Sequence, residues 1–185
     1  MGGMDLAMHY VCTHDQARRL IKAHEEFWVS NCGCRESKAN CKRSRMDVCL
    51  IFDPADPGSG TGKHEITRAE ADALVKEADD HYLVTRPWRN ADRTRTDGIC
   101  FCCDDCCGYF SDPNERCDKG DLRQKTDMDE CIQCGVCVDL CYFHARVMVD
   151  DELRVTEDNC YGCGLCVPVC PVQCIEMVAA GEAVS

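Results

Sequence analysis

Five cysteines fall within eight consecutive residues of the stretch GICFCCDDCCGYF, at positions 98–110. They are Cys100, Cys102, Cys103, Cys106 and Cys107. A mesh of disulfides among such near neighbours is disfavoured, because a disulfide tightly restricts the Cα separation and the Cβ directions of its two cysteines. Thiols that stay reduced are usually metal ligands or redox groups. The stretch therefore predicts a metal site.

A second set of cysteines forms an internal repeat. CIQCGVCVDLC at 131–141 and CYGCGLCVPVC at 160–170 share the spacing C-x2-C-x2-C-x3-C, and the period is 29 residues. A [4Fe–4S] cubane needs four thiolate ligands, and cysteines at every third residue of a loop can turn three of them toward one cluster. The fourth ligand of each cluster must then come from elsewhere in the chain.

This doubled motif resembles the bacterial-type two-cluster ferredoxins over about 55 residues. The resemblance implies two [4Fe–4S] clusters, each completed by the last cysteine of the opposite copy. The first cluster is expected on Cys131, Cys134, Cys137 and Cys170, and the second on Cys160, Cys163, Cys166 and Cys141. Zinc is the alternative metal, since C-x2-C pairs also suit tetrahedral zinc, but each copy carries the full cysteine order of a cubane site.

The repeat departs from the family pattern at two positions. Pro171 follows the last cysteine of the second copy as expected, whereas Tyr142 stands at the equivalent place in the first. This change affects the local turn and the solvent access near the second cluster. Cys174 stands where such families usually have a small residue, and we expect it to be a packed thiol because both clusters already have four ligands.

The part of the chain before the repeat, residues 1–126, holds 11 of the 20 cysteines, which a plain ferredoxin does not need. The candidate ligands here are Cys32, Cys34, Cys41 and Cys49, together with Cys100, Cys102, Cys103, Cys106 and Cys107. The combination faintly resembles uncharacterised iron–sulfur proteins of anaerobes. We expect one or two additional iron–sulfur clusters, with a structural zinc or a redox-active dithiol as alternatives.

The vicinal pairs in the opening stretch limit how many cysteines one cluster can use. Successive side chains diverge along an extended or helical backbone, so Cys102–Cys103 and Cys106–Cys107 cannot all point at one small cluster. Some of these thiols must be spare or must bind a second site.

Two segments carry the signals of helices. Thr13 followed by Gln16 forms a capping box, and apolar residues recur at helical spacing over 17–28. A second capping box begins at Thr67, and apolar residues at helical spacing follow it to about residue 81.

Other segments predict strands and loops. VCLIF at 48–52 is typical of a buried strand, and the Pro- and Gly-rich residues 53–62 of a loop. Residues 86–98 have no periodicity and are expected to be a polar linker. In the repeat, each cysteine-rich loop should lead into a short helix, with residues 145–149 and 174–178 as strands.

The predicted fold class is α+β, with a mainly helical cysteine-rich domain followed by a ferredoxin-like dicluster domain. The expected divisions are an N-terminal helical domain at 1–98 with a cysteine-rich segment at 32–49, a cysteine-rich metal-binding segment at 99–126, and the dicluster domain at 127–185.

The charge of the chain bears on its partners. The formal net charge is −12, and the residues from Asp127 onward contribute −9 of it, with 11 acidic and 2 basic side chains. This charge opposes binding to nucleic acid or anionic lipid and favours a partner with a basic docking surface. The chain has no signal-peptide pattern at its start and no apolar run of about eighteen residues, so we expect a cytoplasmic protein without a membrane span.

These features predict a protein that passes single low-potential electrons through its clusters. No catalytic nucleophile stands out, so an electron carrier or a redox-complex subunit is expected rather than a stand-alone enzyme. One alternative is the electron-input subunit of a larger anaerobic oxidoreductase whose active centre includes the N-terminal metal site. A second alternative is a zinc-stabilised interaction module.

Overall fold

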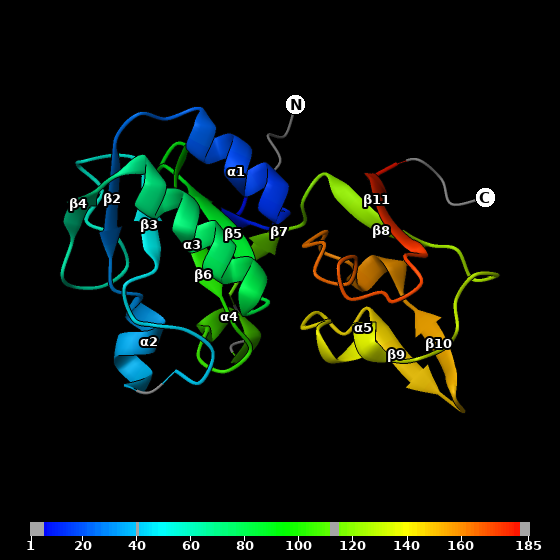
Figure 1. Cartoon of the computed structure of the whole chain (residues 1–185). Helices are drawn as coiled ribbons and strands as arrows, with labels where there is room; N and C mark the ends of the chain where they lie inside the picture. Colours follow the sequence, from blue (N-terminus) through cyan, green and yellow to red (C-terminus); the bar gives the residue numbers. More distant parts are fainter. Residues whose placement is uncertain (1–5, 40, 112–114, 182–185) are drawn as a thin grey trace.

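The computed structural model describes residues 6–39, 41–111 and 115–181. The chain forms two lobes that lie side by side (Figure 1). The first lobe ends with strand β7 (Cys117–Asp118), and the second begins with strand β8 (Leu122–Thr126). None of the helices in these described ranges is long and apolar enough to cross a lipid bilayer.

A seven-stranded sheet in the order β4-β2-β3-β6-β5-β1-β7 is the centre of the first lobe. Neighbouring strands are antiparallel, except that β1 and β7 run parallel. The remaining strands are β1 (His9–Tyr10), β2 (Phe27–Ser30), β3 (Cys49–Ile51), β4 (His64–Ile66), β5 (Val84–Arg89) and β6 (Thr96–Cys102).

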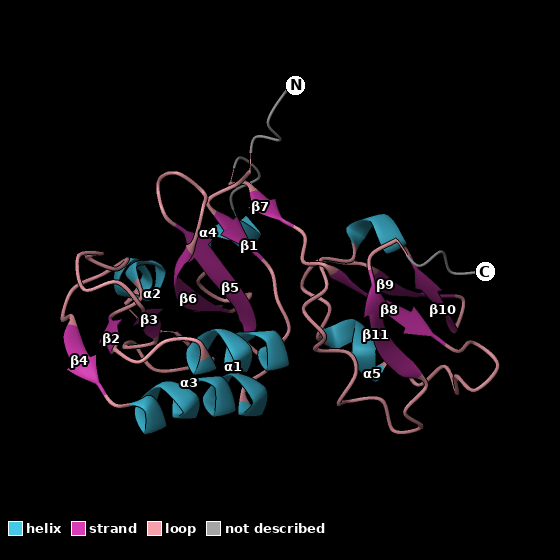
Figure 2. Cartoon of the chain, turned by 90° about the horizontal axis from the view of Figure 1, so that it is seen from above, coloured by secondary structure: helices cyan, strands magenta, loops and turns pink. Residues whose placement is uncertain are grey.

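Helices α1 (His14–Lys22) and α3 (Arg68–Asp80) lie next to each other along one face of this sheet (Figure 2). Both begin at the predicted capping boxes, in which the side chains of Thr13 and Thr67 accept hydrogen bonds from backbone N–H groups one turn into each helix. Of the two shorter helices, α2 (Gly33–Lys38) precedes β3 and α4 (Gly108–Ser111) follows β6.

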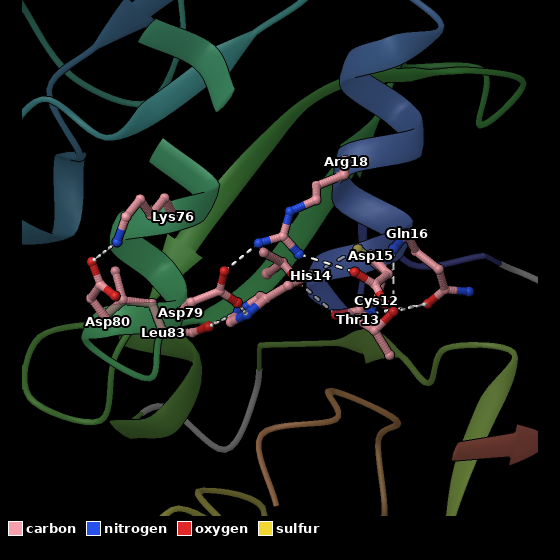
Figure 3. A network of polar contacts seen from close by, with 11 residues as sticks. Cys12, Thr13, His14, Asp15, Gln16, Arg18, Lys76, Asp79, Asp80 and Leu83 are labelled. Carbon is pink, nitrogen blue, oxygen red and sulfur yellow. Dashed lines mark hydrogen bonds and ion pairs between the residues drawn. The ribbon is translucent and has the colours of Figure 1, made fainter. Parts of the chain in front are cut away.

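Polar contacts hold α1 against α3 at the end near the second lobe (Figure 3). The Nδ1 atom of His14 lies 2.5 Å from the Asp79 carboxylate, and its Nε2 atom lies 2.7 Å from the carbonyl oxygen of Leu83. Arg18 also donates to Asp79. These contacts tie both helices to the residues that lead into β5.

The prediction of a mainly helical N-terminal domain is wrong, because the sheet dominates this lobe. Residues 27–30 do not continue the first helix but form β2, which pairs with both β3 and β4. Residues 86–98 are not a linker but belong largely to β5 and β6. The sequence does not reveal these strands, because the buried side chains of β5 include the polar residues Thr85 and Arg86. Tertiary contacts, and not local hydrophobicity, determine this strand.

The alternation of side chains along β6 separates two environments. Ile99, Phe101 and Cys103 pack into the apolar core beneath α1 and α3. Cys100 and Cys102 point to the opposite face, where Cys102 packs with Val11 and Val84. Thiols from one strand therefore reach both faces of the sheet.

The second lobe consists of two small antiparallel strand pairs. Strand β8 pairs with β11 (Ile175–Ala179), and β9 (Arg146–Val149) pairs with β10 (Glu152–Val155). The first cysteine loop leads into the predicted short helix, α5 (Val136–Asp139), whereas turns take that place in the second copy. A 3₁₀ turn at Glu157–Asn159 precedes the second cysteine loop.

An aromatic cluster joins the two lobes. Tyr109 and Phe110 of the first lobe contact Tyr142, Phe143 and Tyr161 of the second, and the rings of Phe143 and Tyr161 stack with centroids 4.4 Å apart. Such aromatic pairs bury large apolar areas in specific geometries. The cluster therefore fixes one lobe against the other.

Backbone contacts support the same junction. The N–H of Gly120 donates to the carbonyl oxygen of Tyr161 over 3.0 Å. A Cβ atom at Gly120 would lie 2.5 Å from the carbonyl oxygen of Val11, so the close approach of the two segments requires glycine here.

Candidate metal centres

The cysteines of the repeat gather around two separate cavities in the second lobe. Cys131, Cys134, Cys137 and Cys170 line the first cavity. The last of these comes from the opposite copy, as the ferredoxin resemblance implies. Apolar side chains such as Leu153 and Val169 complete the wall, which suits a cluster shielded from water.

The second cavity is lined by Cys141, Cys160, Cys163 and Cys166, again with one cysteine from the opposite copy. Its walls include Phe143 and Tyr161, which belong to the aromatic cluster at the lobe junction. Burial raises the pKa of Cys163 to about 12 and that of Cys166 to about 11. A metal bound here would have to displace protons from these thiols.

The two unusual positions of the repeat have distinct surroundings. Tyr142 is buried, and its ring contacts Phe110 at a centroid distance of 5.8 Å. The residue that replaces the family's proline is therefore part of the lobe junction. Cys174 also lines the first cavity, and its Sγ atom lies 3.5 Å from that of Cys170.

A third thiol group lies in the first lobe. The Sγ atoms of Cys41, Cys103 and Cys106 all lie within 4.8 Å of one another. Cys41 Sγ is 3.7 Å from Cys103 Sγ, which in turn is 3.3 Å from Cys106 Sγ. Cys32 packs against the same apolar core. The structure thus brings Cys41 of the 32–49 segment together with Cys103 and Cys106 of the 100–107 stretch.

The remaining candidate ligands of the 32–49 and 100–107 segments lie apart from this third thiol group. Electrostatic interactions connect neighbouring thiols from Cys34 through Cys107, Cys102 and Cys100 to Cys49. Interactions with the thiols of Cys107 and Cys32 lower the pKa of Cys34. All twenty cysteines lie in the described residues and none forms a disulfide.

Buried arginines accompany these groups, and sequence reasoning missed them. The three largest fully buried side chains among the described residues are Arg35, Arg86 and Arg146. A buried guanidinium is costly unless negative charge or hydrogen-bond acceptors surround it. Each of the three lies near several cysteines, whose thiolate forms would supply that charge. No sequence pattern singles them out, since burial alone distinguishes them from the surface arginines.

Arg146 lies between the two cavities of the second lobe. Its Nη1 atom donates to the Sγ of Cys137 over 3.4 Å, and its Nη2 atom donates to Gln124 and Thr126. Despite burial, interaction with the thiolate forms of Cys166 and Cys137 raises the pKa of this arginine. It is therefore a fixed positive charge beside cysteines of both cavities.

Arg35 is the buried positive charge beside the third thiol group. It is fully buried, its Nη2 atom donates to the carbonyl oxygen of Phe101 over 2.9 Å, and its Nη1 atom donates to Ser44 Oγ over 3.0 Å. Despite burial, interaction with the thiolate forms of Cys41 and Cys32 raises the pKa of this arginine.

The two cavities differ in their access to solvent. Cys134 of the first cavity is exposed, and Ile132 and Val136 beside it are 60% and 45% exposed. Cys160 of the second cavity is buried, and the first lobe covers this side through the aromatic cluster. Contact with another protein is therefore possible at the first cavity.

Comparison with known proteins identifies part of the chain. Residues 124–177 match the family model described as a 4Fe-4S dicluster domain. No curated protein matches the chain. The matched segment includes all eight cysteines that divide between the two cavities. The match supports an iron–sulfur domain of the ferredoxin-like type at residues 124–177.

Proposed function

We propose that the protein transfers single low-potential electrons through two [4Fe–4S] clusters held in the two cavities of the second lobe. The observation that supports this most is the crosswise division of the eight cysteines, four to each cavity. Clusters with four thiolate ligands supply one-electron chemistry, with potentials set by charge, hydrogen bonding and exposure. Buried Arg146 supplies charge and hydrogen bonds at both sites.

An additional iron–sulfur centre belongs to this proposal. Its ligands are Cys41, Cys103 and Cys106, and Cys32, which packs against the same core and interacts with Arg35, is the candidate for the fourth. The close approach of the three Sγ atoms and the buried charge of Arg35 support the site. Zinc is the competing occupant, since four thiolates also suit a structural zinc ion.

The exchange of electrons with a partner takes place at the first cavity in this scheme. Its cysteine loop is partly exposed, and acidic residues lie directly before this loop in the chain and at the turn between β9 and β10. They are Asp127, Asp129, Glu130, Asp150, Asp151 and Glu152. A redox protein with a basic docking surface matches this charge, and the reduced thiols suit a cytoplasmic, anaerobic setting.

A second candidate function is the electron-input subunit of a larger oxidoreductase complex. It is favoured by two exposed apolar side chains on one face of β9, Val147 and Val149, which are 39% and 44% exposed. Apolar patches on soluble proteins commonly mark interaction surfaces. A stable partner that remains bound through purification would support this candidate over a free carrier.

Anaerobic metal analysis of the full-length protein tests the proposal. Two cubanes require about eight irons and eight sulfides per chain, and the additional centre requires about four more of each. Reduction with dithionite should bleach the charge-transfer absorption of the clusters. Zinc without iron, or an iron content of about four or fewer after complete reconstitution, would refute electron transfer through two clusters.

A further inference from the structure

The 100–107 stretch sends its cysteines in two opposite directions. Cys103 packs into the core beneath the helices and joins Cys106 and Cys41. Cys102 and Cys107 instead belong to the apolar cluster at the lobe junction. Each vicinal pair is thus divided between two environments, so one small cluster cannot use all four thiols.

A second set of thiols is assembled on the junction side. Cys34 comes from α2, where its thiol interacts with that of Cys107, and Cys107 and Cys102 belong to one apolar cluster and both lie within 3.8 Å of Arg86 Nη1. Cys100 lies two residues before Cys102 on the same face of β6, and the two thiols interact electrostatically. Three separate segments of the chain therefore bring four thiols together.

A buried cation accompanies this set as well. The Nη1 atom of Arg86 lies 3.3 Å from Cys107 Sγ and 3.8 Å from Cys102 Sγ, and its Nη2 atom donates to Glu115 over 2.7 Å. The Nε atom is buried and has no hydrogen-bond partner among the described residues. In these contacts the acidic partner of Arg86 is Glu115 alone, whose side chain is 37% exposed. Thiolates bound to a metal would supply the missing negative charge.

We propose that Cys34, Cys100, Cys102 and Cys107 ligate a second iron–sulfur centre in the first lobe, separate from the one at Cys41, Cys103 and Cys106. Cys49 lies next to Cys100 on the neighbouring strand and is an alternative fourth ligand. The centre goes beyond the proposed function, which requires only one additional site. The two can therefore fail independently.

The residues around this centre connect it with the second cavity. The guanidinium carbon of Arg86 lies 4.3 Å from the centre of the Tyr109 ring. Tyr109 contacts Phe143 and Tyr161, both of which line the second cavity. Cys102, Cys107 and Cys163 also belong to one apolar cluster. An electron leaving the second cavity would meet this centre through packed, water-excluded contacts.

Neighbouring cysteines provide matched variants for the test. Cys102→Ser/Cys107→Ser removes two ligands of the proposed centre, and Cys103→Ser/Cys106→Ser removes two of the other site from the same stretch. Buried Cys12, which lies outside both groups, serves as a third control through Cys12→Ser. Iron, sulfide and zinc would be measured per chain in the full-length proteins, purified and reconstituted without oxygen.

The wild-type protein should contain about sixteen irons, the total for four cubanes. Each double variant should lose about four irons, and a variant that combines the two pairs of substitutions about eight, while Cys12→Ser loses none. Mössbauer spectroscopy of the wild-type protein counts the irons independently, so the test does not depend on the folding of any variant. Twelve irons in the wild type with no iron lost from Cys102→Ser/Cys107→Ser, zinc in place of the iron lost from that variant, or the same irons lost from both double variants would each overturn the proposal.

Discussion

Arg146 Nη1 donates a hydrogen bond to the Sγ of Cys137 over 3.4 Å, and this arginine is 2% exposed. Its charge also acts on Cys166 of the other cavity. One buried side chain thus bears on the electrostatics of both cavities of the ferredoxin-like domain. Because a positive charge stabilises the reduced, more negative form of a cluster, Arg146 should raise both reduction potentials.

Replacing this arginine tests that relation. Arg146→Met should lower the potentials of the two clusters by on the order of 100 mV, from the loss of a unit charge a few ångströms away at an effective dielectric constant of about 20. Arg146→Lys, which retains the charge, should shift them less. Protein-film voltammetry or a redox titration followed by EPR measures both potentials.

The exposed Arg154 on the adjacent strand is the matched control, since Arg154→Met removes the same charge from a solvated position. Potentials that move equally in Arg146→Met and Arg154→Met would show that burial beside the cysteines has no special effect.

Cys170 and Cys174 lie with their Sγ atoms 3.5 Å apart, which allows one to replace the other as a ligand. Cys174→Ser should leave the iron content unchanged, because the proposed first site keeps its four cysteines. The Cys170→Ser variant should lose only part of the iron of the first site, because Cys174 can replace the missing ligand. The Cys170→Ser/Cys174→Ser variant should lose about four irons per chain. Iron and sulfide analysis of reconstituted proteins measures these losses. Full iron content in the double variant would contradict ligation across the two copies.

The acidic residues of the turn between the copies should accelerate encounter with a basic partner. The second-order rate of electron transfer should fall as salt rises from low to physiological strength, where the screening length is about 8 Å. Converting Asp150, Asp151 and Glu152 to neutral amides should flatten this dependence in stopped-flow measurements.

Exposed acidic residues of the first lobe provide the control for charge alone. Amide substitutions at Glu25, Glu26 and Asp92 change the net charge by the same amount on the other lobe. A rate that responds equally to both sets would mean that the overall charge, and not docking near the first cavity, governs encounter.

The hydroxyl of Tyr142 is buried and has no hydrogen-bond partner among the described residues. Removing a buried, unsatisfied polar group lowers the free energy of the folded state, so Tyr142→Phe should stabilise the protein by about 1 kcal/mol. Tyr10→Phe should have the opposite effect, since the Tyr10 hydroxyl lies 2.8 Å from Thr96 Oγ1. Anaerobic urea unfolding compares the two variants. Destabilisation by Tyr142→Phe would indicate a polar partner for this hydroxyl.

The doubled cysteine spacing, the two capping boxes and the strands at 145–149 and 174–178 could all be predicted from the sequence, because each depends on residues close together in the chain. The same holds for the conclusion that vicinal cysteines must diverge, which follows from backbone geometry alone.

Contacts between distant residues decided the rest. The sheet of the first lobe depends on pairing among strands whose buried faces include arginine and threonine, so local hydrophobicity could not reveal it. Cys41 meets Cys103 across 62 residues of sequence, and Arg86 meets Cys107 across 21. The spacing of cysteines within one segment carries no information about contacts between distant segments. Only the packing of the sheet and the lobe junction determined how the N-terminal thiols divide and which arginines are buried beside them.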